Sequence, residues 1–297
     1  MHINQVRELI SKHGIAPQDR YDLPASEGRF PDGAHYRNEI SGIGWPKDLE
    51  ELVDEMQKRS VPVHRVIMGS IVKLSQGDLR DIAQMAHGHK LEIVMDLGVT
   101  SISDIGRHAE TPFGKWGGWR VRGADNMAYL VQAVLRGAEA GFRAFLLYDE
   151  GALWLLGKMR AAGDLPADTL FKVSYTAGYR SPAGARLLEE LGADSFNPVT
   201  DLELPMLAAI RQTVHIPMDI VIFGWETLGN VCRVSQSPEI IRVAAPCYLK
   251  QELAGDARAK VKYCEIIREM VQASAPQLVL SGQGPTDLRI PAVGPRG

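Results

Sequence analysis

Residues 127–161, MAYLVQAVLRGAEAGFRAFLLYDEGALWLLGKMRA, decide the fold. The first part, 127–140, carries apolar residues at helical spacing, and Gly141 follows it as a typical helix end. The run AFLLY at 144–148 is apolar or aromatic at every position, which is typical of a parallel strand buried on both faces. Residues 153–161 return to helical spacing. A helix, a buried strand and a second helix in this order indicate a repeating β/α unit.

The same strand pattern occurs eight times along the chain. The predicted strands are 35–40, 63–68, 91–95, 144–148, 171–175, 195–199, 218–223 and 243–250. Predicted helices follow at 49–59, 78–87, 127–140, 153–161, 183–191, 204–212, a short 238–241 and 257–273. Eight strands alternating with helices favour an α/β protein with a closed (β/α)₈ barrel, the TIM barrel. An open, doubly wound sheet is the alternative.

We expect residues 1–297 to form one barrel domain, with three segments outside the repeat. Residues 1–33 form an N-terminal extension that begins with a helix at 3–13. Residues 99–123 form a long insertion after the third strand. The tail at 282–297 is rich in Pro and Gly, so we expect it to be irregular or docked on a neighbour.

Composition excludes several classes of function. Apolar residues make up 45% and charged residues 23% of the 297, with a net charge of −3, and no element shows the basic stripe of a nucleic-acid binder. No apolar run is long enough to span a membrane. The first residues lack the layout of a signal peptide, and three cysteines are too few for a disulfide framework. We therefore expect a cytoplasmic homo-oligomer that acts on a small molecule.

Active sites of such barrels lie at the C-terminal ends of the strands. Polar residues in or after the predicted strands are Arg37, Glu39, His64, Arg65, Asp96, Asp149, Glu150, Lys172, Asn197, Glu226 and Lys250. Buried charges are costly unless they pair or bind a ligand, so we interpret the set as a site. For each single residue a structural ion pair stays open as the alternative, and Glu150 could simply be an acidic residue in a helix first turn.

The residue types suggest two chemistries. Glu39, His64, Asp96 and Glu226 could hold Mg²⁺, Mn²⁺ or Zn²⁺, although no HxH or HExxH spacing is present. Glu39, His64, Asp149 and Glu150 could also act as acids or bases.

The lysines Lys172 and Lys250 could form a Schiff base with a carbonyl substrate if they are desolvated. The alternatives are an amine paired to a carboxylate and an anchor for a substrate carboxylate. Arg37, Arg65 and Asn197 would bind the substrate's negative or polar groups.

The insertion at 99–123 contains Trp116, Trp119 and Arg120 among glycines and further basic residues. Long loops in compact domains are usually functional or disordered. We interpret the insertion as a lid that closes over an anionic or planar substrate, with an oligomer contact as the alternative. No phosphate-binding glycine loop and no GxSxG elbow accompany it.

Several motifs between residues 29 and 252 resemble those of the barrel proteins grouped with U32 peptidases. They are RFPDG at 29–33, PVHR at 62–65, DEG at 149–151, LGADSFN at 191–197 and PEIIRVAAP at 238–246. The resemblance implies a barrel fold and either proteolysis or iron–sulfur redox chemistry. Members of the second kind use four cysteines, whereas this chain has Cys232, Cys247 and Cys264, so we do not expect a cluster.

The leading hypothesis is therefore an enzyme, a metal-assisted or acid–base lyase, aldolase or hydrolase that acts on a polar, carboxylate-bearing substrate. A U32-type peptidase or an iron–sulfur redox enzyme is the second hypothesis. A barrel that binds a ligand without catalysis is the third.

Overall fold

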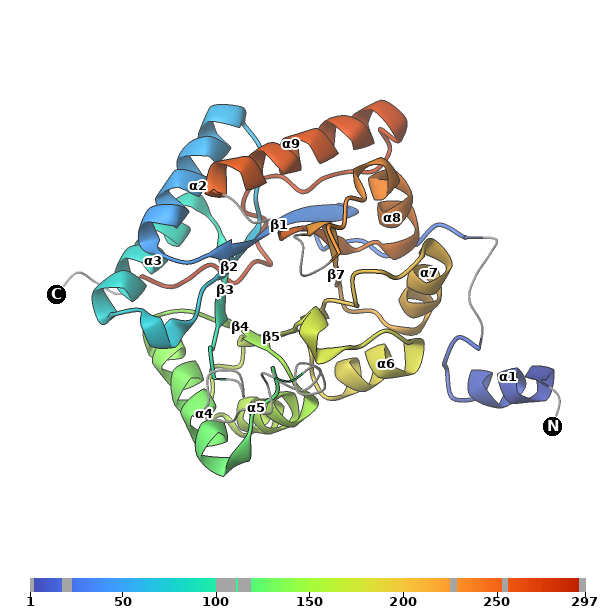
Figure 1. The fold of residues 1–297 in the computed structure, drawn as a ribbon, viewed down its shortest axis with the longest axis horizontal. Coiled ribbons are helices and arrows are strands. Elements are labelled where there is room, and N and C mark those ends of the chain that lie inside the picture. Colours follow the sequence, from blue (N-terminus) through green and yellow to red (C-terminus); the bar gives the residue numbers. More distant parts are fainter. Residues whose placement is uncertain are drawn as a thin grey trace.

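Eight parallel strands close into a barrel in chain order, with β1 hydrogen-bonded to both β2 and β8 (Figure 1). The strands are β1 (Tyr36–Ile43), β2 (Arg65–Met68), β3 (Glu92–Asp96), β4 (Ala144–Leu147), β5 (Leu170–Val173), β6 (Ser195–Phe196), β7 (Met218–Gly224) and β8 (Cys247–Glu252). This computed structural model describes residues 3–17, 23–99, 111, 119–224, 229–252 and 256–293. The predicted (β/α)₈ barrel is confirmed.

Helices surround the barrel as an outer ring (Figure 1). They are α2 (Pro46–Arg59), α3 (Gln76–His89), α4 (Gly123–Glu139), α5 (Glu150–Ala162), α6 (Pro182–Glu190), α7 (Leu204–Thr213), α8 (Ser237–Ala244) and α9 (Ala257–Ser274). Side-chain caps fix where four of them begin, since Ser75, Asp149, Ser181 and Asp256 each accept a backbone N–H of the first turn. Their apolar faces form the main core against the outside of the strands.

The predicted eighth strand at 243–250 begins too early. Val243 and Ala244 belong to α8, which therefore extends beyond the predicted 238–241, and both are buried on its inner face. Strand β8 starts only at Cys247, after Pro246. An apolar run that crosses from a buried helix into a buried strand has no periodicity that marks the boundary.

Helix α1 (Ile3–Ser11) confirms the predicted N-terminal helix and lies outside the ring of helices (Figure 1). Of the insertion at 99–123, only residues 99, 111 and 119–123 belong to the described part, so the predicted lid and Trp116 lie outside it. Within the described residues, no helix is long and apolar enough to span a membrane.

The described part of the tail, residues 282–293, packs on its own barrel at the N-terminal ends of β1 to β3. Gln283 donates to the carbonyl oxygen of Val63 (2.8 Å) and accepts from its N–H (3.1 Å). The N–H of Arg289 donates to Glu92 Oε2 (2.9 Å). The described part of the tail thus covers this end of the barrel.

Candidate active site

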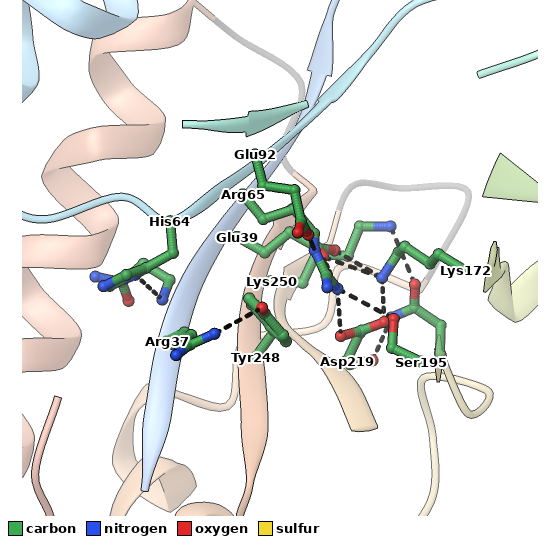
Figure 2. A network of polar contacts seen from close by, with 12 residues as sticks. Arg37, Glu39, His64, Arg65, Glu92, Lys172, Ser195, Asp219, Tyr248 and Lys250 are labelled. Carbon is green, nitrogen blue, oxygen red and sulfur yellow. Dashed lines mark hydrogen bonds and ion pairs between the residues drawn. The ribbon is translucent and has the colours of Figure 1, made fainter. Parts of the chain in front are cut away.

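A layer of charge lies inside the barrel, where Glu39 (β1), Lys172 (β5) and Asp219 (β7) meet (Figure 2). Lys172 Nζ lies 3.0 Å from both carboxylate oxygens of Glu39 and donates a further hydrogen bond to Asp219. Elsewhere Val94 of β3 belongs to a small apolar cluster with Ile67 and Leu146. In barrels of this fold, interior layers are dominated by branched apolar side chains. The layer of Glu39, Lys172 and Asp219 is therefore unusual in its charge.

Arg65 (β2) binds this layer from the side of the N-terminal ends. Its guanidinium donates hydrogen bonds of 3.3, 2.6, 3.1 and 3.2 Å to the side chains of Glu39, Glu92, Ser195 and Asp219. Its face lies 3.8 Å from the ring centroid of Tyr248 (Figure 2). Because these contacts are all to other side chains of the barrel interior, Arg65 holds the carboxylates of the layer in position. Its predicted role in binding a substrate stays a prediction.

The ionisable groups of this layer differ in the direction in which their pKa values shift. Burial raises the pKa of Asp219, and the neighbouring Glu39 raises it further. Burial alone would also raise the pKa of Glu39, but the cations Lys172 and Arg65 hold it below its usual value. Burial lowers the pKa of Lys172 despite its two carboxylate partners. Asp219 is therefore the carboxyl group of this pair that retains a proton more readily.

A second ionic cluster lies nearer the C-terminal ends of the strands. Lys250 Nζ is 2.5 Å from Glu252 Oε2, and Tyr175 OH donates to the other oxygen of Glu252 (3.4 Å). The ammonium also lies 5.1 Å from the centre of the Tyr175 ring. Asn197 Oδ1 accepts from Lys250 (3.5 Å), while the Asn197 amide donates to the backbone oxygen of Asp219. Asn197 therefore connects the two clusters.

Lys250 is a persistent cation. Burial alone would lower its pKa, but the carboxylates of Glu252 and Glu39 raise the pKa well above its usual value. Glu252 ends β8 and its side chain is 12% exposed, against 2% for Lys250. The lysine is thus covered, and its carboxylate partner is the member of the pair that reaches toward solvent.

An aromatic stack lies at the ends of β3 and β4. Tyr148 shares a hydrogen bond with Asp96, and its ring stacks on Trp119 with centroids 5.2 Å apart. Burial raises the pKa of Asp96, although the N–H of Gly98 donates to its carboxylate (2.9 Å). The predicted residues Asp96 and Trp119 therefore belong to one polar and aromatic cluster at the C-terminal face.

Asp149 and Glu150 have structural partners. Asp149 caps α5 by accepting from Ala152 N (2.8 Å), and its other oxygen accepts from Val121 N (3.0 Å). Glu150 pairs with Arg120 at 2.7 Å and accepts from Tyr179 OH at 3.0 Å. The catalytic role of the two acids and the substrate-binding role of Arg120 stay predictions, and the structure assigns all three residues structural partners. Their contacts tie the residues before α4 to the start of α5.

Arg37 lies at the opposite end of the barrel from the expected site. It stands at the beginning of β1 and makes a two-fold hydrogen bond to Asp287 of the tail (2.8 and 2.7 Å). Its Nε donates to Ser281 Oγ at 2.9 Å. Arg37 therefore lies away from the C-terminal face where a substrate was expected, and its substrate-binding role stays a prediction.

His64 likewise precedes β2 and lies near Arg37 (Figure 2). Its Nδ1 accepts from Asn38 N (3.0 Å), so Nε2 carries the proton and donates to the backbone oxygens of residues 281 and 282 (both 3.1 Å). Burial lowers its pKa to about 4. His64 is thus a buried, neutral residue bonded to the backbone at the N-terminal end, and its catalytic role stays a prediction.

The predicted metal ligands do not converge. Glu39 is engaged by Lys172 and Arg65, His64 lies at the N-terminal end, and Asp96 lies at the C-terminal face. Glu226 is outside the described residues. Among the residues that the structure describes, no group of three or more His, Cys, Asp or Glu could hold a metal ion. The three described members of the predicted ligand set therefore lie apart, and metal binding stays a prediction.

The cysteines are dispersed. Cys247 and Cys264 are buried, on β8 and α9, and Cys232 is exposed. Burial raises the pKa of both buried thiols well above the usual range. Thiols in that state behave as core residues rather than as thiolates.

Sequence reasoning missed Glu92, Ser195, Asp219, Tyr175 and Tyr248 as members of these clusters. Glu92 and Asp219 lie at the N-terminal ends of their strands, whereas the candidates were sought at the C-terminal ends. Alternation places Asp219 on the same face of β7 as Val221, while a register shift between Val221 and Phe223 interrupts the pattern further along the strand.

No protein-family model matches the sequence, and no curated protein sequence matches it. Similar solved structures include a truncated 3-deoxy-D-arabino-heptulosonate 7-phosphate synthase from Thermotoga maritima, with a TM-score of 0.49, 12% identity, and coverage of 89% of this chain and 96% of that one. A 3-hexulose-6-phosphate synthase has a TM-score of 0.46 at 16% identity, with coverage of 78% and 98%. The U32 peptidase Mk0906 has a TM-score of 0.42 at 15% identity, with coverage of 69% and 74%. The likeness is one of barrel fold.

Proposed function

We propose that this chain is an enzyme of the lyase or aldolase class that performs acid–base chemistry on a small, carboxylate-bearing substrate at the C-terminal face of the barrel. The observation that carries the proposal is the cluster of Lys250, Glu252 and Tyr175 next to the buried charge layer. Burying so many ionisable groups is costly, and a barrel can be filled with apolar residues instead. Perturbed ionisable groups at this end of a barrel are typical of active sites.

Lys250 would act as a fixed positive charge. Its raised pKa keeps it an ammonium, so it does not supply the neutral amine that a Schiff base requires. A buried ammonium can bind a substrate carboxylate or stabilise the oxyanion of an enolate. This supports the anchoring role of Lys250 over the nucleophilic one.

Glu252 would be the base. Its carboxylate accepts a proton from the carbon beside the substrate carbonyl, and the electron pair of that C–H bond moves onto the carbonyl oxygen. Lys250 stabilises the negative charge formed there. The Tyr175 hydroxyl, hydrogen-bonded to Glu252, orients the carboxylate. Proton abstraction of this kind is the half-reaction that lyases and aldolases share.

Glu39, Lys172 and Asp219 would support this chemistry electrostatically. They do not reach the C-terminal face, but Asn197 connects Asp219 to Lys250. Glu39 would help to keep Lys250 charged, and the contact through Asn197 would hold it in place.

The experiment is hydrogen–deuterium exchange at carbon, followed by ¹H NMR in D₂O with pyruvate, 2-oxobutanoate and oxaloacetate as probes. We expect the protein to accelerate loss of the C3 proton signal of at least one probe. Lys250→Met should slow the exchange by about 100-fold or more, the effect typical of removing a group that stabilises an oxyanion. Lys158→Met, on the exposed surface of α5, is the matched control and should exchange at the wild-type rate.

Two results would overturn the proposal. One is a wild-type protein that exchanges none of the three probes. The other is a Lys250→Met protein that exchanges as fast as the wild type. Binding of a probe without exchange would instead favour the ligand-binding barrel.

A further inference from the structure

A cavity of about 560 Å³ lies at the N-terminal end of the barrel, away from the candidate active site. Residues 24–29 form one wall, the C-terminal half of α7 forms another, and Val243 with Pro246 forms a third. Val214 and Pro246 precede β7 and β8, which places the cavity at the opposite end from Lys250. None of its lining residues belongs to the clusters described above.

Arg211 is the central charge of this cavity. Its guanidinium donates hydrogen bonds only to backbone oxygens, those of Val214, Ile216 (3.0 Å) and Pro246 (3.5 Å). Within the described part of the chain it forms no ion pair with a carboxylate. Burial lowers its pKa to about 10. Burial therefore outweighs the charge of Glu189, which raises the pKa of Arg211, and among the described residues the Nε–H has no acceptor.

Arg29 supplies a second cation to the same cavity. Its Nη1 donates to the backbone oxygens of Ser26 (3.0 Å) and Gly28 (2.6 Å), which turns the guanidinium toward the wall formed by residues 24–29. No ion pair of Arg29 is recorded among the residues the structure describes. His215 lies at the rim, 3.7 Å from Glu189, which itself pairs with Arg186.

Negative charge is sparse in this cavity. Glu27 is the acidic residue among those that line it, and it is exposed. Two guanidiniums therefore face a space with one solvated carboxylate, so the cavity carries a positive potential. The rest of the wall includes short apolar side chains such as Pro24, Ala208 and Val243.

We propose that this cavity is a second ligand site, which binds a small organic anion. Its carboxylate or phosphate group would lie against Arg29 and Arg211, and a short hydrocarbon part would contact the apolar wall. Arginine is suited to this because its planar donors match both kinds of oxyanion. The site is independent of the catalytic proposal, because its residues lie at the other end of the barrel.

The test is isothermal titration calorimetry of the Lys250→Met protein, in which the anchor proposed for the active site is absent. The probes are butanoate, inorganic phosphate and the neutral butanamide. We expect butanoate or phosphate to bind and butanamide not to bind. Arg29→Gln should weaken anion binding at least about tenfold, as expected for loss of a charged hydrogen bond. Arg258→Gln, an exposed arginine of α9, is the matched control and should bind like its parent.

Arg211→Lys is the second variant, because it keeps the charge while removing donors, and it also should weaken binding. Equal binding of butanoate and butanamide would overturn the proposal. Unchanged anion binding in both the Arg29→Gln and the Arg211→Lys protein would also overturn it. Absence of anion binding by the parent protein would also overturn it. Failure of the exchange experiment at the C-terminal face would leave these outcomes unaffected.

Discussion

Replacing Lys172 by Met removes a cation from between two buried carboxylates, so its effect tests the charge layer directly. At an effective dielectric constant of about 20, a pair 3.0 Å apart attracts by roughly 5.5 kcal/mol, and Lys172 makes this contact with Glu39 and a second, close one with Asp219. The burial cost of the ammonium offsets much of that attraction. Breaking a buried pair by removing one partner costs about 3 to 5 kcal/mol, and we expect a loss of stability in that range at pH 7.

The loss should shrink as the pH falls from 7 to 5. Without Lys172, the pKa of Asp219 rises further above its unfolded value, so the folded variant binds a proton that the unfolded chain does not. Folded states that bind more protons gain stability as the pH decreases. Urea unfolding at both pH values, followed by tryptophan fluorescence, measures the difference against wild type.

Lys158→Met serves again as the control and should change stability by less than about 0.5 kcal/mol, as surface substitutions do. A loss of stability below about 1 kcal/mol in Lys172→Met would refute the reasoning, because removing a fully paired buried cation should destabilise the fold by more than this. A deficit that grows toward pH 5 would refute the proton-uptake argument.

Three further predictions concern the ends of the barrel. Asp287→Asn should lower the stability by about 1 to 3 kcal/mol, because it removes the charge that pairs with buried Arg37 from a partly exposed position. The difference in stability from wild type should fade below pH 4, where wild-type Asp287, whose pKa is lowered, also takes up a proton. From pH 7 to pH 5 the wild type should lose about 2 kcal/mol of stability through His64, because its pKa of about 4 lies below its unfolded value. Urea titrations of His64→Gln at the two pH values should not show this contribution to the loss. Asp149→Ala should cost about 0.5 to 2 kcal/mol through loss of the α5 cap, and a stability equal to wild type would contradict the capping role.

The strands were predictable because each strand of a closed parallel barrel is buried on both of its faces. The runs at 144–148 and 218–223 are apolar at nearly every position, and both became strands with small shifts at their ends. The boundary at Val243 was not predictable, because a buried helix and a buried strand have the same composition there. The contacts of the tail were not predictable either, since Pro- and Gly-rich sequence carries no periodicity.

The candidate site was only half predictable. Glu39, Lys172 and Lys250 were identified because charges inside apolar strands are conspicuous, and all three lie in the barrel interior. Arg37 and His64 were misplaced because the residue type does not say at which end of a strand it lies. Asp219 was missed for the same reason, since it stands at the start of β7 and still reaches the charge layer.

The pairing of Arg37 with Asp287 has a consequence for biosynthesis. The two residues are 250 positions apart, so a buried charge in the first strand acquires its two-fold hydrogen bond only when nearly the whole described chain has been made. At about 5 to 20 residues per second, the ribosome needs on the order of 12 to 50 seconds to cover that distance. During this interval Asp32, 3.6 Å from Arg37 in the finished barrel, is the carboxylate already available to this guanidinium, and it does not form the two-fold hydrogen bond that Asp287 forms. The nascent chain therefore has an electrostatic reason to keep its first strand open until the tail emerges.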